Sequence, residues 1–459
     1  GRGSAAQRNQ GTALTTVTER LYAIGMSDAE AARKEALFAR ALDGLEKLGA
    51  PAAAAVQFWV PGRIEFLGKH TDYAGGRSLL CAIERGFCVV AAARSDSRLR
   101  VLDAHSGDLV EGDVHPATSG RSSHWGAYPL TVAHRVAANF SPPLAGADMA
   151  FVSDLPIASG ISSSSALVVA TYLVLAEVNG LAARDEFRRV ITIPAELAEY
   201  LGAVENGLTY RTLVGERGVG TFGGSEDHTA ILCGRPHALV QYSFCPVRFE
   251  RAIPLPADHT FVIASSGVMA EKTGAALESY NRLATLAHAA LERWRRATGR
   301  TDASLGDALR AAGGAESLAE VMRSDGAQSE RFSADALAER ARQFAIESEE
   351  LIPAAGDALE RGALDELGAV VDRSMRNAVE MLHNQIDETI FLAARARELG
   401  AVAASAFGAG FGGSVWALVR RAESASLSEQ LLGDYRQRFP EHTGAQVFVT
   451  PAGPAATKL

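Results

Sequence analysis

Hydrophobic residues recur every three or four positions in several stretches of the chain, and this spacing predicts amphipathic helices. The first stretch contains Leu37, Ala41 and Leu45. It follows Ser27, which with Glu30 three positions later predicts a capping box at the helix start. Further helices are predicted over residues 165–178, 194–202, 275–296, 333–349, 366–382, 387–399 and 426–437.

Short apolar and β-branched runs between these helices predict strands. They cover residues 58–60, 64–67, 88–93, 99–102, 150–152, 229–232, 238–242, 261–264, 414–419 and 446–449, with a turn at Pro61-Gly62. Strands and helices are mixed in both halves of the chain, which predicts an α+β protein with two closely packed domains. We place a flexible lead-in at 1–26 and domains at 27–222 and 223–459.

Composition limits the classes of function. The 459 residues are too many for one ordinary domain, and 47% hydrophobic with 22% charged residues is typical of soluble globular proteins. The net charge of −9 argues against nucleic-acid binding. The best apolar run, 166–178, is too short to span a membrane, and residues 1–20 lack a signal-peptide pattern. Four cysteines without C-x-x-C spacing indicate free thiols. We therefore expect a cytoplasmic monomer or weak dimer without nucleic-acid or membrane partners.

A first group of polar residues lies just after the turn at Pro61-Gly62. Arg63, Lys69, His70 and Asp72 crowd into one short stretch. Such a cluster can hydrogen-bond a polyhydroxylated ligand, and the alternative is a solvated turn at the end of a strand.

A second group is the Gly- and Ser-rich segment 156–166, in which Gly160 is followed by four consecutive serines at 162–165. Small residues allow a ligand close to the backbone, and the unpaired N–H groups of a helix start attract anions. The segment therefore fits a triphosphate, although the chain has no common P-loop motif. The alternative is a serine-rich helix cap.

Two further glycine-rich segments lie at 206–224 and 407–414. The second is followed by a predicted strand, which argues against a dinucleotide site, because that site needs a helix there. A close passage of backbone past a ligand or a neighbouring loop fits better, with a plain turn as the alternative. Six glycines in the first segment suggest a mobile loop.

These segments, in this order, resemble the GHMP small-molecule kinases, and within them the galactokinase family. Residues 61–73 resemble its sugar signature P-G-R-x-N-x-I-G-E-H-T-D-Y, and 156–166 resemble its phosphate loop P-x-G-x-G-L-S-S-S-A-S. Residues 223–228 resemble the G-x-M-D-Q segment with the catalytic aspartate, 408–414 resemble G-x-G-F-G-G-C, and 279–282 resemble a segment whose tyrosine contacts the sugar. The resemblance implies the two-domain GHMP kinase fold, with the active site in the cleft between the domains.

The resemblance also implies a reaction and its residues. The chain would transfer the γ-phosphate of ATP to the anomeric hydroxyl of galactose or a related sugar. Asp227 would take the hydroxyl's proton, Arg63 would stabilise charge beside it, and Ser164 with Glu205 would ligate Mg²⁺. The sugar-binding residues would be Lys69, His70, Asp72, Gly224 and Tyr280. The ATP-binding residues would be Gly160, Ser162, Ser163, Ser164 and Ser165.

The chain departs from the family pattern at several of these positions. Lys69 replaces a glutamate that in the family contacts the sugar's C6 hydroxyl, and Glu65 replaces an asparagine. An ammonium only donates hydrogen bonds, so one interpretation is a preference for a C6-acid sugar such as galacturonate. The alternative is that Lys69 points to solvent or pairs with Glu65. We expect Glu226 to be a surface charge, and His228 stands where the family has glutamine.

Two other functions remain open at this point. One is a kinase for a related pentose or uronate, and the other is a non-catalytic sensor that binds sugar and ATP. Asp227, Arg63 and the serine run are all present, which favours catalysis.

Overall fold

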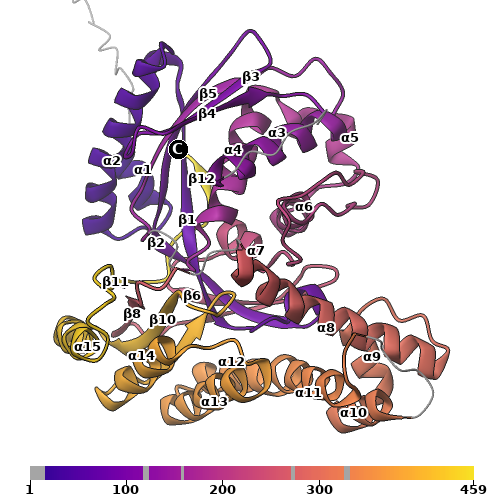
Figure 1. Ribbon diagram of the computed structural model, residues 1–459. Helices are drawn as coiled ribbons and strands as arrows, with labels where there is room; N and C mark the ends of the chain where they lie inside the picture. The colour runs from indigo at the N-terminus through magenta and orange to yellow at the C-terminus, as the bar shows by residue number, and fades with distance from the viewer. Residues whose placement is uncertain (1–15, 117–123, 157–159, 270–273, 325–330) are drawn as a thin grey trace, which may run out of the picture.

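Two β-sheets organise the protein, which we describe from a computed structural model (Figure 1). The described residues are 16–116, 124–156, 160–269, 274–324 and 331–459. The large sheet has the strand order β12-β1-β2-β5-β3-β4, and β6 and β7 continue it from the other part of β2. Its strands are β1 (Val56–Leu67), β2 (Arg77–Ala93), β3 (Arg98–Asp103), β4 (Leu109–Asp113), β5 (Ala147–Ser153), β6 (Ala238–Ser243), β7 (Arg248–Pro254) and β12 (Thr457–Lys458).

Helices cover both faces of this sheet, because successive side chains of a strand point to opposite faces. Trp59 of β1 packs with α1 (Val17–Ala23) and α2 (Asp28–Lys47), whereas its neighbour Phe58 packs in the core with the helices of the other face. Those helices are α3 (Ala127–Asn139), α4 (Ser163–Val178), α5 (Asp185–Arg188), α6 (Pro194–Asn206) and α7 (Glu226–Cys233). Because α4 is apolar on nearly all sides, it is buried between its neighbours.

The second sheet has the order β11-β8-β10-β9 and lies in the lower half of Figure 1. Its strands are β8 (His259–Ser265), β9 (Ala403–Phe407), β10 (Ser414–Arg420) and β11 (Gln446–Thr450), and α14 (Asp387–Glu398) and α15 (Ser424–Arg438) cover one face. Phe66 of β1 stacks on Trp416 of β10 with ring centroids 4.1 Å apart. The two sheets therefore share one hydrophobic core.

A helical layer completes the lower half and has its own core around Phe344. It consists of α8 (Gly274–Thr298), α9 (Leu305–Ala312), α10 (Ala315–Arg323), α11 (Ala334–Ala345), α12 (Ile352–Glu360) and α13 (Leu364–Asn377), with π-helical turns at Ile346–Leu351 and Ala378–Leu382. The helices α8 to α11 form the core around Phe344, whereas α12 and α13 pack into the core shared by the two sheets. Short 3₁₀ turns lie at Ala52–Ala54, Asp72–Ala74, His124–Gly126, Leu181–Ala183 and Arg421–Glu423.

The mixed α+β architecture predicted from the sequence is confirmed, and most predicted elements are present. The division at 222/223 stays a prediction. The strands β6, β7 and β12 all follow residue 223 in sequence, yet they belong to the large sheet with the N-terminal strands.

Several local predictions were wrong. Residues 229–232 are helical, within α7, and the strands predicted on either side of Pro61-Gly62 are one strand, whose register shifts between Pro61 and Arg63. Within the predicted flexible lead-in, residues 17–23 form α1 and bury Leu21, while 1–15 lie outside the described residues.

The predicted capping box at the start of α2 was also wrong. The hydroxyl and the backbone N–H of Ser27 both donate to the carboxylate of Glu84, whereas Glu30 pairs with Arg33 and Lys34. A carboxylate distant in sequence therefore replaces the local cap.

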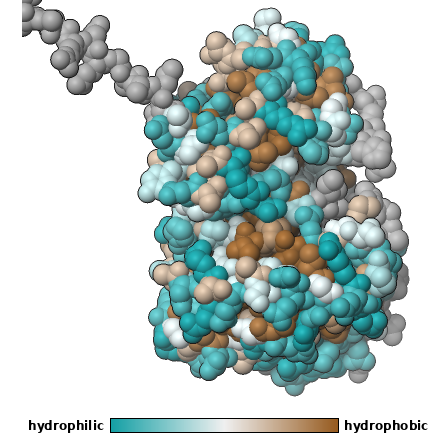
Figure 2. Space-filling model, turned by 90° about the vertical axis from the view of Figure 1, so that its left-hand side faces the viewer, coloured by the Kyte–Doolittle hydropathy of each residue, from teal (hydrophilic) through white to brown (hydrophobic). Residues whose placement is uncertain are grey.

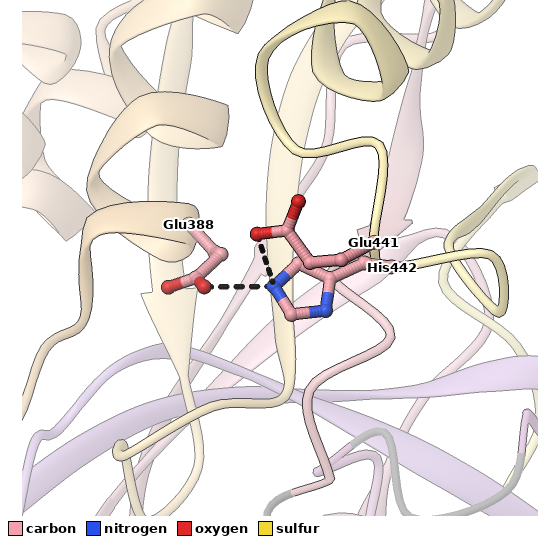
Figure 3. Close-up of side chains that lie close together, drawn as sticks. All are labelled: Glu388, Glu441 and His442. Atoms are coloured by element: carbon pink, nitrogen blue, oxygen red, sulfur yellow. Dashed lines mark hydrogen bonds and ion pairs between the residues drawn. The ribbon is translucent and has the colours of Figure 1, made fainter.

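Two further features of the molecule are the hydropathy of one face and a cluster formed by one histidine and two glutamates. The face that carries α1, α2 and α15 is mostly hydrophilic, with hydrophobic side chains gathered near mid-height (Figure 2). At the start of α14, His442 Nε2 lies 2.8 Å from Glu388 and 3.7 Å from Glu441, so both carboxylates approach one ring nitrogen (Figure 3). No helix among the described residues is both long and apolar enough to cross a membrane.

Candidate active site

Four segments that are distant in sequence meet where the two halves join. They are the end of β1 with its following loop, the N-terminus of α4, the start of α7 and the turn between β9 and β10. Arg63 donates to the carbonyl of Gly160, the N–H of Gly408 donates to Glu65, and His70 Nε2 lies 3.0 Å from the carbonyl of Ala409. The segments that the sequence analysis singled out are thus in direct contact.

Arg63 and Asp227 form the central ion pair of this junction. Arg63 is 3% exposed, its Nε donates to Asp227 Oδ1 at 2.7 Å, and its Nη1 donates to Gly160 O at 2.7 Å. Burial opposes the guanidinium charge, but Asp227, with Glu65 and Glu226 nearby, outweighs it and raises the pKa of Arg63. A permanent positive charge therefore lies between Asp227 and the loop before α4.

The second oxygen of Asp227 faces a hydroxyl that also contacts another carboxylate. Ser165 Oγ lies 3.4 Å from Asp227 Oδ2 and donates to Glu205 Oε2 at 2.9 Å. Glu205 comes from α6 and is 3% exposed, and His228 Nε2 lies 3.1 Å from the same Glu205 oxygen. The sequence analysis assigned Ser165 to ATP, whereas the structure directs its hydroxyl to the two acids.

The loop before α4 exposes the groups expected of an anion site. Gly160 and Ser162 have φ of +73° and +60°, so the backbone turns sharply before the helix begins at Ser163. Within the described residues α4 has no side-chain cap, and Ser162 Oγ is buried without a hydrogen-bond partner. An orphaned buried hydroxyl beside uncapped N–H groups is a combination that a phosphate would satisfy.

The oxygen groups near this helix start fit a magnesium ion. Mg²⁺ binds one or two protein oxygens together with phosphate oxygens and waters. Glu205 supplies a buried carboxylate, and Ser164 lies in the first turn of the same helix as Ser165, which contacts that carboxylate. The residues present therefore fit the ion, and its ligation by Ser164 and Glu205 stays a prediction.

The loop after β1 is held by a carboxylate from the helical layer. Glu347 is fully buried and accepts the N–H groups of Gly68 and Lys69 at 3.1 and 3.4 Å, as well as the hydroxyl of Ser374 at 2.8 Å. Arg340 of α11 donates to the carbonyl of His70. Sequence reasoning missed Glu347, Ser374 and Arg340, because no local motif connects them with a loop that lies 270 to 305 positions away.

Lys69 does not point to solvent, so that part of the alternative interpretation was wrong. Its side chain is buried, with the residue 1% exposed, and its ammonium donates to Ser374 Oγ at 3.3 Å. Burial raises the pKa of Glu65 to about 7, against the opposing effect of Lys69 and Arg63. Glu65 and Lys69, which both depart from the family pattern, thus belong with Glu347 to one buried network of charged side chains.

Unlike Lys69, the other predicted sugar-binding residues, His70, Asp72, Gly224 and Tyr280, contact one another or residues next to Asp227. The ring centroids of His70 and Tyr280 are 5.6 Å apart, and His70 Nδ1 lies 2.9 Å from the hydroxyl of Tyr73. Asp72 Oδ2 accepts the N–H of Glu226 at 3.0 Å. A side chain at Gly224 would place its Cβ 2.3 Å from Asp72 Oδ2, so only glycine permits this approach.

Glu226 is not the surface charge that we expected. It is 6% exposed, and its Oε2 accepts the hydroxyl of Ser78 at 2.9 Å. Burial, together with Glu65, Asp72 and Asp227, raises its pKa well above the ordinary value. Glu226 is therefore a buried acid whose surroundings favour its protonated form, and it lies where strand β2 packs against the first turn of α7.

The glycine-rich segment 206–224 is attached at both ends. Asn206 accepts the N–H of Gly223 and the hydroxyl of Thr221, while Asn281 of α8 bonds to the backbone of Gly220 and Phe222. These bonds fix the chain just before Asp227.

Known proteins resemble this chain along most of its length. The galactokinase galactose-binding signature matches residues 46–93, and the GHMP kinases N terminal domain matches 127–209. The chain is 29% identical to a galactokinase of Roseiflexus sp. (strain RS-1) over 398 residues, which cover 85% of this chain and 90% of that protein. It is 26% identical to a galactokinase of Thermococcus kodakarensis over 387 residues, or 84% and 95% of the two chains.

Solved structures share the fold. The structure of Lactococcus lactis galactokinase complexed with galactose has a TM-score of 0.69 at 23% identity, covering 88% of this chain and 95% of that one. Methanococcus jannaschii mevalonate kinase has a TM-score of 0.51 at 12% identity, covering 87% and 98%. At these identities the likeness establishes the arrangement of helices and sheets.

Proposed function

Because this chain belongs to the galactokinase family of GHMP kinases, and is a galactokinase-like sugar kinase, we propose that it transfers the γ-phosphate of ATP to the anomeric hydroxyl of galactose. The observation that carries the proposal is the Arg63–Asp227 pair. It lies between the loop after β1, which matches the galactose-binding signature, and the uncapped start of α4.

Asp227 is the general base in this proposal. A carboxylate within hydrogen-bond reach of the anomeric hydroxyl accepts its proton as the oxygen attacks phosphorus. Arg63 holds one oxygen of Asp227 and carries a fixed positive charge where negative charge develops during transfer. His70, Asp72, Gly224 and Tyr280 surround the sugar, and Lys69 acts on it through the shape of the loop.

The nucleotide phosphates bind at the start of α4 in this proposal. The backbone and hydroxyl groups from Gly160 to Ser164 contact the phosphates, supported by the orphaned hydroxyl of Ser162. Ser164 and Glu205 hold Mg²⁺, which when bound neutralises charge on the phosphates. The chain's own residues then have to align the sugar hydroxyl with the phosphorus atom, which is the main requirement of phosphoryl transfer.

The other functions considered from the sequence receive less support. A preference for C6-acid sugars needs a lysine ammonium available to the sugar, whereas the Lys69 ammonium donates to Ser374 within a network that also contains Glu347. A sensor without catalysis would not require the pairing of Arg63 with Asp227. We therefore assign galactose as the substrate.

The test is ADP release with Mg·ATP against galactose, arabinose, glucose, galacturonate and glucuronate. We expect galactose to give the highest kcat/KM. Turnover on the uronates alone would overturn the assignment of galactose and restore the direct role of Lys69. Binding of sugar and nucleotide without ADP release would favour the sensor.

A further inference from the structure

Ser165 occupies an unusual place between two acids, the buried Glu205 and the half-buried Asp227. It lies in the first turn of α4, is 1% exposed, and its hydroxyl contacts Glu205 Oε2 at 2.9 Å and Asp227 Oδ2 at 3.4 Å. The family pattern quoted above has alanine at this position and serine at the next, where this chain has Ser165 and Ala166, so the Ser165 hydroxyl stands one position earlier than the last serine of the pattern. It contacts the very carboxylate that would take the proton in the proposed reaction.

Two carboxylates at such close quarters repel each other, and low exposure strengthens the repulsion. Arg63 compensates one oxygen of Asp227, and the remaining oxygen faces the side occupied by Glu205. A serine hydroxyl carries a single proton, so it donates to one acid at a time. The contact with Glu205, at 2.9 Å, is the shorter of the two, and the hydroxyl lies between the acids as a donor within reach of both.

We propose that Ser165 is a positioning residue, whose hydroxyl fixes the Asp227 carboxylate against Glu205 so that Asp227 meets the sugar in one orientation. This inference rests on the proposed function, in which Asp227 is the base. The guanidinium of Arg63 also positions Asp227, and it donates a further hydrogen bond to the carbonyl of Gly160. Arg63 and Ser165 therefore contact opposite oxygens of the same carboxylate, at 2.7 and 3.4 Å.

Ser165→Ala is a clean test because the substitution creates the residue of the family pattern and raises helix propensity. We expect kcat to fall about tenfold or more, because a misaligned reacting group costs rate. The KM values for galactose and ATP should stay within about twofold, since neither substrate touches this hydroxyl in the proposal. Ser165→Thr restores the hydroxyl and should recover most of kcat.

Two further variants separate positioning from other roles. Thr171→Val removes another buried hydroxyl of α4, which bonds only within the helix, and should leave kcat unchanged. Mn²⁺ binding to the complex with a non-hydrolysable ATP analogue, followed by electron paramagnetic resonance, gives a readout without turnover. We expect Ser165→Ala to bind Mn²⁺ as wild type does and Ser164→Ala to bind it more weakly.

The outcomes are distinct. A kcat for Ser165→Ala equal to that of wild type overturns the inference and leaves the proposed function intact. Loss of Mn²⁺ binding in Ser165→Ala also overturns it, because the hydroxyl would then be a metal ligand. If wild type releases no ADP with any sugar, the proposed function fails and the inference fails with it.

Discussion

The loop after β1 and the loop before α4 face each other across Arg63, yet their polar groups differ in whether they are hydrogen-bonded within the protein. In the first, the backbone N–H groups of Gly68 and Lys69 are bonded to Glu347, a carboxylate of the protein itself. In the second, the buried hydroxyl of Ser162 has no partner among the described residues, and the helix behind it has no side-chain cap. The loop after β1 takes its shape from hydrogen bonds within the protein, whereas the loop before α4 has polar groups that the described residues do not satisfy.

This difference separates two kinds of sensitivity. Substitutions behind the sugar loop should change stability and sugar binding together, since the loop's shape depends on buried partners. Substitutions in the phosphate loop should change nucleotide binding with little effect on folding. Asp227 belongs to neither loop and should affect turnover alone.

The largest expected effect comes from Asp227→Asn. An amide cannot accept the sugar's proton, so kcat should fall about 1,000-fold or more, while the Kd of the ATP analogue stays near that of wild type. Steady-state kinetics and calorimetry measure the two quantities. Glu226→Gln is the matched control, because Glu226 is the buried neighbouring acid and its raised pKa favours the neutral form, which the amide imitates. Turnover by Asp227→Asn at the wild-type rate would remove Asp227 as the base.

Glu347→Ala should give the next largest effect, on the sugar side. It leaves two N–H groups and the hydroxyl of Ser374 without their acceptor and removes one of the carboxylates in the network around Lys69. We expect the free energy of unfolding to fall by about 3 kcal/mol, as when a buried charged network loses one member, and the KM for galactose to rise.

Denaturant titration and sugar kinetics test the prediction for Glu347. Adding Lys69→Met to Glu347→Gln removes the charges of both residues and should recover part of the lost stability. An unchanged Kd for the ATP analogue would sharpen the contrast between the loops. Equal losses of sugar and nucleotide affinity would break it.

Glu65→Gln tests the buried charge network through pH. The pKa of Glu65 is raised to about 7 in the folded protein, so the folded state binds this proton more tightly than the unfolded state does. The protonated carboxyl therefore makes its full contribution to the free energy of unfolding below the ordinary pKa near 4.5. That contribution is lost as the pH rises through about 7.

We expect Glu65→Gln to gain stability over wild type between pH 5 and pH 8, by on the order of 2 kcal/mol. Urea unfolding at the two pH values measures this change, with Glu46→Gln on the exposed side of α2 as the control. A difference between Glu65→Gln and wild type that does not vary with pH would contradict the assigned titration.

Ser162→Ala should give the smallest effect, confined to the phosphate loop. The hydroxyl makes no bond within the described residues, so its loss should leave the free energy of unfolding within about 0.5 kcal/mol of wild type. The Kd for the ATP analogue should rise about fivefold if the hydroxyl meets a phosphate oxygen. Calorimetry decides this, and an unchanged Kd would show that the hydroxyl does not serve the nucleotide.

Motif order and local chemistry predicted the parts of the site that depend on short segments. The contact of Arg63 with Asp227, and the approach of Gly160 to the turn at Gly408, bring together segments that the family resemblance had already connected. Helix periodicity also predicted α4 and α6, which position the serines and Glu205.

The rest depended on partners that no local pattern reveals. Glu347 lies 278 positions from Lys69, so nothing near Lys69 indicated that its ammonium would be buried. The cap expected at Ser27 was lost to Glu84, and the strand expected at 229–232 is helical because it continues from Asp227 in α7. For Lys69 and Ser27, a tertiary contact outweighed a local preference.

The most direct test of the central claim is the product itself, identified by ³¹P NMR after wild type and Asp227→Asn act on galactose with Mg·ATP. The account predicts a phosphate coupled to the anomeric proton of galactose in the wild-type reaction, and none with Asp227→Asn under the same conditions. Phosphate on any other hydroxyl, or release of ADP without a sugar phosphate, would contradict it.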